Sequence, residues 1–134
     1  MELQGRCIVK GKVSGEALVT KDNISFMGSM NPKTGVIIER GHELEGKSIA
    51  GKILVFPTAK GSTGGSYMLY DVVKNNAGPI GIINARAESI VVIGAIVSEL
   101  PMIDNIDISK IKTGDQLELD ATSGTVRILG RQIN

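Results

Sequence analysis

The sequence contains few of the residues from which common catalytic and cofactor sites are built. Cysteine and histidine each occur once in 134 residues. The chain therefore cannot form an internal disulfide, and it cannot supply a cysteine-ligated cluster or a cysteine-based zinc site by itself. Tryptophan is absent and aromatic residues make up only 3%, which leaves little from which to build a base-stacking platform.

Charge and hydrophobic runs exclude two further classes. Fifteen Lys and Arg oppose 14 Asp and Glu, for a net charge of +1, so no basic excess indicates binding to nucleic acid or to an anionic membrane. No apolar run reaches the roughly 18 residues of a membrane span. The first residues, 1–4, do not form the start of a signal peptide. We therefore expect a cytoplasmic protein.

The residues that are abundant favour strands and tight turns. Hydrophobic residues make up 42%, glycine occurs 17 times, and isoleucine outnumbers leucine 18 to 9. This mixture is typical of β-structure rather than of a helical bundle. We expect one α/β domain over residues 1–134, with a mixed sheet, strands at both termini and about two central helices.

Local patterns predict the individual elements. A helix is expected from Ser66, as its N-cap, to Asn76, and a second buried helix over 90–100. Residues 52–84 are then expected to form a strand, a glycine loop, a helix and a second strand. This order and length are typical of a crossover between parallel strands. Strands are expected over 4–13, 15–20, 36–38, 52–56, 80–84 and 102–104, and around 117–119 in a hairpin with 125–129.

The glycine loop at 61–66 is the sharpest chemical feature. It joins a strand to a helix, where backbone N–H groups and the helix dipole favour an anion. Neither the Walker A pattern nor the dinucleotide fingerprint occurs, and a plain glycine turn remains an equal alternative. The candidate ligand-binding residues are Lys60, Gly61, Ser62, Thr63, Gly64, Gly65 and Ser66.

A second polar loop, 28–35, contains Asn31 and Thr34 at a turn. On the residues alone, a solvated loop is the favoured interpretation. The only histidine, His42, is expected to be a structural hydrogen-bonding residue rather than a catalyst. Cys7 is expected to be a small buried hydrophobic residue.

Several separated segments together resemble the small subunit, or swivel domain, of the aconitase X family. They are GHELEGKSIAGKILVFP at 41–57, GSTGGS at 61–66, GPIGIIN at 78–84, and GAIV at 94–97 followed by Pro101. The segment NPKTG at 31–35 also fits, with Asn31 where the family usually has Asp. The resemblance covers roughly residues 3–130.

The resemblance implies a swivelling β/β/α fold and a hydro-lyase that is active only with a large subunit carrying a [4Fe-4S] cluster. In two-chain archaeal-type members it implies dehydration of mevalonate 5-phosphate to trans-anhydromevalonate 5-phosphate in isoprenoid biosynthesis. The family's proton acceptor, a serine of the glycine loop, corresponds to Ser62, and no metal ligand is expected on this chain. The other loop residues, with Asn31 and Thr34, are expected to bind substrate.

Two alternatives remain open. One is the same chemistry on another substrate, such as a hydroxyproline. The other is a non-catalytic swivel domain that holds an anion. Residues 78–126 also resemble a phosphohistidine swivel domain, but no histidine lies near Ile93, where the phosphocarrier residue would fall. We further expect the glycine loop to face the partner's cluster. The run 90–103 is expected either to form an apolar interface or to lie in the domain's own core.

Overall fold

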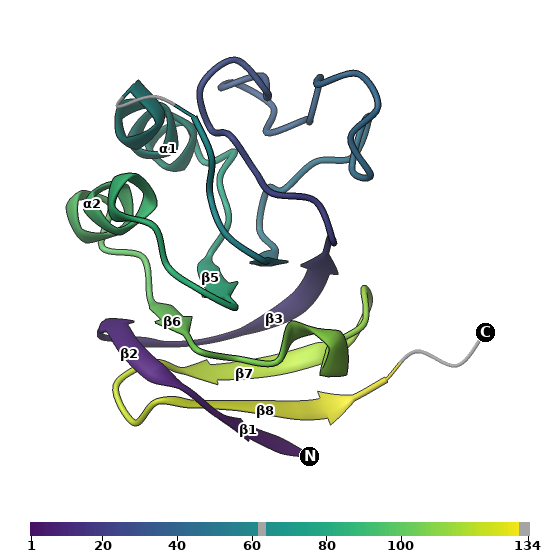
Figure 1. Ribbon diagram of the computed structural model, residues 1–134, viewed down its shortest axis with the longest axis vertical. Coiled ribbons are helices and arrows are strands. Elements are labelled where there is room, and N and C mark those ends of the chain that lie inside the picture. The colour runs from purple at the N-terminus through teal and green to yellow at the C-terminus, as the bar shows by residue number, and fades with distance from the viewer. Residues whose placement is uncertain (62–63, 132–134) are drawn as a thin grey trace.

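The chain folds into two layers of strands covered on one side by a layer of helices (Figure 1). The computed structural model describes residues 1–61 and 64–131. Its strands are β1 (Glu2–Gln4), β2 (Arg6–Val9), β3 (Lys12–Val19), β4 (Ile53–Phe56), β5 (Gly81–Asn84), β6 (Met102–Asp104), β7 (Gln116–Asp120) and β8 (Thr125–Gly130). Its helices are α1 (Gly64–Lys74), α2 (Ser89–Val97) and the 3-10 helix η1 (Ile108–Lys110).

Strand β3 connects the two strand layers. The eight strands follow the order β1-β8-β7-β3-β4-β5-β6-β2. The first half of β3 pairs antiparallel with β7, and its last residues, Ala17 to Val19, pair parallel with β4. Strands β4, β5 and β6 continue the parallel arrangement. The predicted crossover from β4 through a helix to β5 is therefore confirmed.

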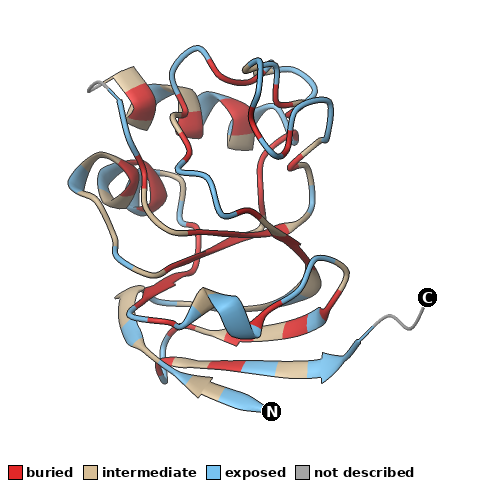
Figure 2. Cartoon of the chain, turned by 45° about the vertical axis from the view of Figure 1, so that its right-hand side comes forward, coloured by how far each residue is buried: buried red, intermediate tan, exposed pale blue. Residues whose placement is uncertain are grey.

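The apolar run of β4 is buried on both faces. Leu54 and Phe56 point into a core beneath α1 and α2, whereas Ile53 and Val55 point into a second core against β7 and β8. Side chains alternate between the faces of a strand, so one short run contributes to both cores. Figure 2 shows this buried band between the helices and the outer strands. The expected mixed α/β fold with three layers is confirmed.

The first strands differ from the prediction of two strands over 4–13 and 15–20. Three strands form instead, because glycines separate them. A Cβ at Gly5 would lie 2.4 Å from the Asp104 carbonyl oxygen, and Gly11 has a φ of +142°. Segment 36–38 also forms no strand, since Val36 and Ile37 make only single bridges, to Ser48 and Met30.

Both helices have different ends from those predicted. Helix α1 begins at Gly64, so Ser66 lies in its first turn and is not its N-cap. Helix α2 begins after Glu88, whose carboxylate accepts a hydrogen bond from the Ile90 N–H at 3.0 Å. It ends at Val97 rather than at Leu100, because Glu99 adopts a left-handed φ of 56°. Strand β6 and the β7–β8 hairpin match their predictions.

Candidate functional site

The glycine loop lies between the carboxyl end of β4 and the start of α1, at the edge where parallel sheets bind ligands. The predicted proton acceptor Ser62 and the predicted binding residue Thr63 lie outside the described residues. The geometry of the site therefore comes from Lys60 and Gly61 on one side and from Gly64 to Ser66 on the other.

Backbone conformation requires glycine on one side of this loop. Gly61 has a φ of +110°, and a Cβ there would lie 2.6 Å from Ser25 Oγ. A Cβ at Gly64 would lie 3.0 Å from Met27 Sδ, a contact that a small shift of the flexible methionine relieves. Gly61 thus has a structural reason to be present, whether or not it also approaches a ligand.

A neighbouring segment, residues 24–27, runs beside the loop. Ile24 forms a parallel bridge with Ala59. The Lys60 N–H donates to the Ile24 carbonyl at 2.9 Å. Ser25 and Met27 therefore border the site. Neither residue could be assigned to the site from the sequence, because the pairing joins segments more than 30 positions apart.

The start of α1 is an electropositive helix end. The helix has 11 residues and no acidic side chain in its first turn. The backbone N–H groups of its first turn and its dipole favour an anion there. The hydroxyl-bearing Ser66 and the small Gly65 lie in this turn.

The charge of Lys60 is partly offset by a residue that sequence reasoning missed. Its Nζ lies 3.4 Å from Glu39 Oε2, and half of the Lys60 side chain is exposed. An exposed ion pair of this kind contributes little to stability. It does reduce the net positive charge that an incoming anion meets at Lys60.

The other two predicted binding residues lie elsewhere. Asn75, just beyond the end of α1, donates from Nδ2 to the Pro32 carbonyl at 3.0 Å. Asn31 and Thr34 are therefore near the opposite end of α1 from the glycine loop, roughly 16 Å away along the helix. Asn31 Oδ1 accepts from the Lys33 N–H at 2.8 Å, and Thr34 Oγ1 accepts from the Val36 N–H at 3.3 Å. The structure does not bring these two residues to the loop, and their binding of substrate stays a prediction.

His42 has the structural role expected of it. It is buried, its Nδ1 accepts from the Leu44 N–H at 3.0 Å, and its Nε2 lies 3.1 Å from the Asn23 carbonyl oxygen. These partners fit a neutral ring with the proton on Nε2. Cys7 is half-buried in β2 rather than fully buried.

Arg86 lies at the same sheet edge as the loop. It follows β5, and its backbone N–H donates to the Pro57 carbonyl at 3.0 Å, directly after β4. Its side chain is exposed, and it makes no ion pair with any residue that the structure describes. Nearby, Asn84 is fully buried, and its Oδ1 has no hydrogen-bond partner within the described ranges.

Asp104 fixes the backbone next to Arg86. Its carboxylate accepts from Arg6 at 2.9 and 2.8 Å and from the Ala87 N–H at 2.9 Å. Burial raises the pKa of Asp104, but these hydrogen bonds and the charge of Arg6 outweigh it and lower the pKa below its ordinary value. The segment after β5 is therefore held rigidly at the sheet edge.

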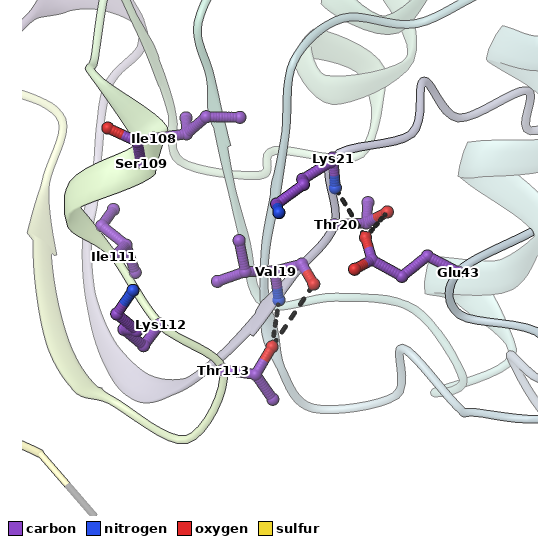
Figure 3. A pocket seen from close by; sticks show the side chains of 9 residues that line it. All are labelled: Val19, Thr20, Lys21, Glu43, Ile108, Ser109, Ile111, Lys112 and Thr113. Carbon is purple, nitrogen blue, oxygen red and sulfur yellow. Dashed lines mark hydrogen bonds between the residues drawn. The ribbon is translucent and has the colours of Figure 1, made fainter.

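A separate cleft of 590 Å³ opens at the carboxyl end of β3 (Figure 3). Glu43 Oε1 accepts from the Lys21 N–H and from the Thr20 hydroxyl, each at 2.7 Å, and these bonds lower the pKa of Glu43. Of the predicted site residues that the structure describes, none lines this cleft. Its lining residues are Val19, Thr20, Lys21, Glu43, Ile108, Ser109, Ile111, Lys112 and Thr113.

The donor set of this chain does not fit a metal cluster. Within residues 1–61 and 64–131, no group of three His, Cys, Asp or Glu side chains is placed to hold a metal ion. The single cysteine falls short of the three or four thiolates that an iron–sulfur cluster takes. Over the same residues, no helix has the length and apolar character needed to cross a membrane.

Comparison with known proteins gives a consistent result. The profile of the aconitase X swivel domain matches residues 2–128. The phosphomevalonate dehydratase small subunit of Thermococcus kodakarensis is 51% identical over 129 residues, covering 96% of this chain and 97% of the relative. The protein of the same description from Methanosarcina acetivorans is 46% identical over 132 residues, covering 96% of this chain and 92% of that one.

Two solved structures share the fold. The crystal structure of Thermococcus kodakaraensis aconitase X, in its holo-form, superposes with a TM-score of 0.95 at 50% identity, covering 97% of this chain and 99% of that chain. A solution structure of a UPF0107 protein gives a TM-score of 0.88 at 41% identity, covering 97% and 100% of the two chains.

Proposed function

Because this chain belongs to the aconitase X swivel domain family, we propose that it is the small subunit of a two-chain phosphomevalonate dehydratase. The complex dehydrates mevalonate 5-phosphate to trans-anhydromevalonate 5-phosphate in isoprenoid biosynthesis. The supporting observation is similarity along nearly the whole length of several small subunits of that enzyme. The alternative substrate, a hydroxyproline, has no comparable support.

The large subunit is the proposed carrier of the [4Fe-4S] cluster. The donor set of this chain does not fit a cluster, so no step of the reaction is assigned to a metal held here. The part of this chain is to bind the substrate's anionic groups and to accept a proton.

Ser62 is the proposed proton acceptor. In the reaction, a C–H bond α to the substrate carboxylate breaks and its proton passes to the serine oxygen. The electron pair forms the new carbon–carbon double bond, and the β-hydroxyl leaves as hydroxide. Transfer of the serine proton to that hydroxide gives water and restores the serine alkoxide. A serine oxygen accepts such a proton only where its anionic form is stabilised. The start of α1 supports this role, because its N–H groups favour negative charge and its first turn has no carboxylate.

Arg86 is the residue proposed to bind the substrate phosphate. Three basic residues, Lys33, Lys60 and Arg86, lie in or beside the candidate loops. Lys33 belongs to the Asn31 turn, and Lys60 is paired with Glu39. Arg86 follows β5 at the same edge as the glycine loop, and guanidinium binds phosphate through two parallel N–H bonds.

The decisive experiment reconstitutes the chain anaerobically with its large subunit and measures dehydration of mevalonate 5-phosphate. We expect Ser62→Ala to lower turnover by about 100-fold or more while leaving assembly intact. Ser123→Ala, in the exposed β7–β8 turn, is the matched control and should retain activity. An active Ser62→Ala complex would refute the assignment of the proton acceptor. A complex that is active only on a hydroxyproline would refute mevalonate 5-phosphate as the substrate. A chain that binds anions but no partner subunit would refute the proposal that it is part of an enzyme.

A further inference from the structure

Helix α2 exposes apolar side chains where a surface helix normally carries polar ones. Its sequence, SIVVIGAIV, contains no charged residue. Val91 and Ala95 face the core, but Ile93, Ile96 and Val97 lie on the opposite face and are more than half-exposed or nearly so. A helix that is apolar all round is normally buried on all sides. The run 90–103 was expected either to form an apolar interface or to lie in the domain's own core. Core burial accounts for only one side of α2.

Helix α1 extends this apolar surface. Tyr67 is 80% exposed, and Tyr70, one turn further on, is partly exposed. The two helices pack closely, because a Cβ at Gly94 would lie 3.2 Å from Leu69 Cβ and 3.3 Å from Ser66 Cα. Their outer faces therefore adjoin, on the side away from the strands (Figure 1). We call this surface the outer helix face; it consists of Tyr67, Tyr70, Ile93, Ile96 and Val97.

The outer helix face continues to the glycine loop. Met27, half-exposed, contacts Gly64 at the start of α1, three residues before Tyr67. Three other large apolar side chains are comparably exposed. Met1 and Leu129 lie in the outer strand layer, and Ile38 lies in the long loop between β3 and β4. Exposed apolar surface is thus concentrated around α1 and α2, next to the proposed catalytic loop.

We propose that the outer helix face is the surface on which the large subunit docks. The assignment rests on the proposed function, in which a partner must reach the start of α1 to complete the site. A partner in that position covers Met27 and Tyr67, and α2 continues the same apolar surface. A stable interface buries about 800 Å² on each partner, to which Tyr67 alone brings on the order of 150 Å². With no charge on α2, the partner's matching surface is apolar.

A matched pair of lysine substitutions tests the proposal. Ile96 in α2 is 56% exposed and Leu129 in β8 is 54% exposed, so neither Ile96→Lys nor Leu129→Lys removes much buried area from the lone chain. Lysine is also the better helix former at position 96. Binding to the large subunit is measured anaerobically by titration calorimetry. We expect Ile96→Lys to weaken binding by about tenfold or more, because docking desolvates a charge, and Leu129→Lys to bind within about twofold of the parent chain.

Equal binding by the Ile96→Lys chain and the parent, or equal weakening by both variants, would overturn the proposal. Sedimentation of the lone chain tests a second copy as the occupant. If the lone chain forms a dimer that Ile96→Lys dissociates, and the Ile96→Lys chain binds the large subunit as tightly as the parent, the proposal is also overturned. Turnover is recorded separately. A complex that forms through this face but does not dehydrate mevalonate 5-phosphate refutes the proposed function alone, and an active complex insensitive to Ile96→Lys refutes the docking face alone.

Discussion

Replacing Gly61 by alanine tests whether this glycine sets the position of the proposed catalytic loop. Two costs arise at this position. Its φ of +110° lies outside the basins that alanine adopts readily, and the new Cβ would meet Ser25 Oγ at 2.6 Å. Strained backbone of this kind costs about 1–3 kcal/mol. The contact adds less, because the hydroxyl of Ser25 can turn away at the expense of its 3.2 Å hydrogen bond to the Met27 carbonyl.

Gly51 provides the matched control for the Gly61 substitution. Its φ is +72°, and nothing lies within 4 Å of the Cβ that alanine would add. Gly51→Ala therefore carries only the left-handed cost of about 1 kcal/mol, against about 3 kcal/mol for Gly61→Ala. At roughly 4 °C per kcal/mol for a chain of this size, the Tm should fall by about 4 °C and about 12 °C respectively.

The double variant Gly61→Ala/Ser25→Ala separates the two costs. Removing the Ser25 hydroxyl relieves the contact but not the backbone strain, so we expect partial recovery of Tm. Thermal unfolding of the lone chain and turnover of the reconstituted complex are measured side by side. Only the variants at Gly61 should lose turnover, because only they displace the loop. A Gly61→Ala chain as stable and as active as the Gly51→Ala chain would refute the reasoning.

Two further predictions concern charged side chains. Arg86→Gln should raise the KM for mevalonate 5-phosphate about tenfold or more with little change in kcat. Lys33→Gln is the control and should leave both constants unchanged. Steady-state kinetics in which both variants match the parent would count against Arg86 as the residue that binds the phosphate. Asp115 pairs with Arg131 at 3.0 Å, as Asp104 pairs with Arg6. Burial raises the pKa of each carboxyl group, but the hydrogen bonds and the arginine charge outweigh it and lower both pKa values below the ordinary 3.8. Their contribution to stability is therefore complete above that value and is lost as the pH falls through the lower folded-state pKa. Urea unfolding of the lone chain from about pH 6 to about pH 2.5 should show this loss, and Arg6→Gln should reduce it; an unchanged acid dependence in Arg6→Gln would contradict the role of the Arg6–Asp104 pair.

Local sequence predicted the central strands well and the long loops poorly. Strands β4, β5 and β6 are short apolar runs bounded by glycine or proline, and their burial follows from their composition alone. Segment 20–52 instead combines turns and single bridges within the segment, such as Met30–Ile37 and Val36–Ser48, with a few bonds to distant residues, such as the Ile24–Ala59 bridge. A short apolar run does not by itself distinguish a single bridge from a strand, so the predicted strand at 36–38 was wrong.

The same distinction applies to the candidate site. The loop between β4 and α1 was predicted from its glycines and its place between a strand and a helix. Its neighbours Ser25, Met27 and Glu39 come from segments that only the tertiary fold brings near. The distance between Asn31 and the glycine loop could not be predicted either, because the order of motifs along the chain does not give their distance in space.

The structure also explains how a chain with so few reactive residue types fits a catalytic role. Most of its candidate polar groups already have structural partners. His42 is hydrogen-bonded at both ring nitrogens, Lys60 is paired with Glu39, and Asn31 caps its own turn. The carboxyl edge of the sheet holds a helix start without a carboxylate, the adjoining glycine loop, and Arg86. An apolar helix face borders them. Such a chain is suited to positioning anions and one serine against chemistry that a partner supplies. Under the proposed function, its apolar surface and its shortage of metal ligands have the same cause, since both follow from a site completed by two chains.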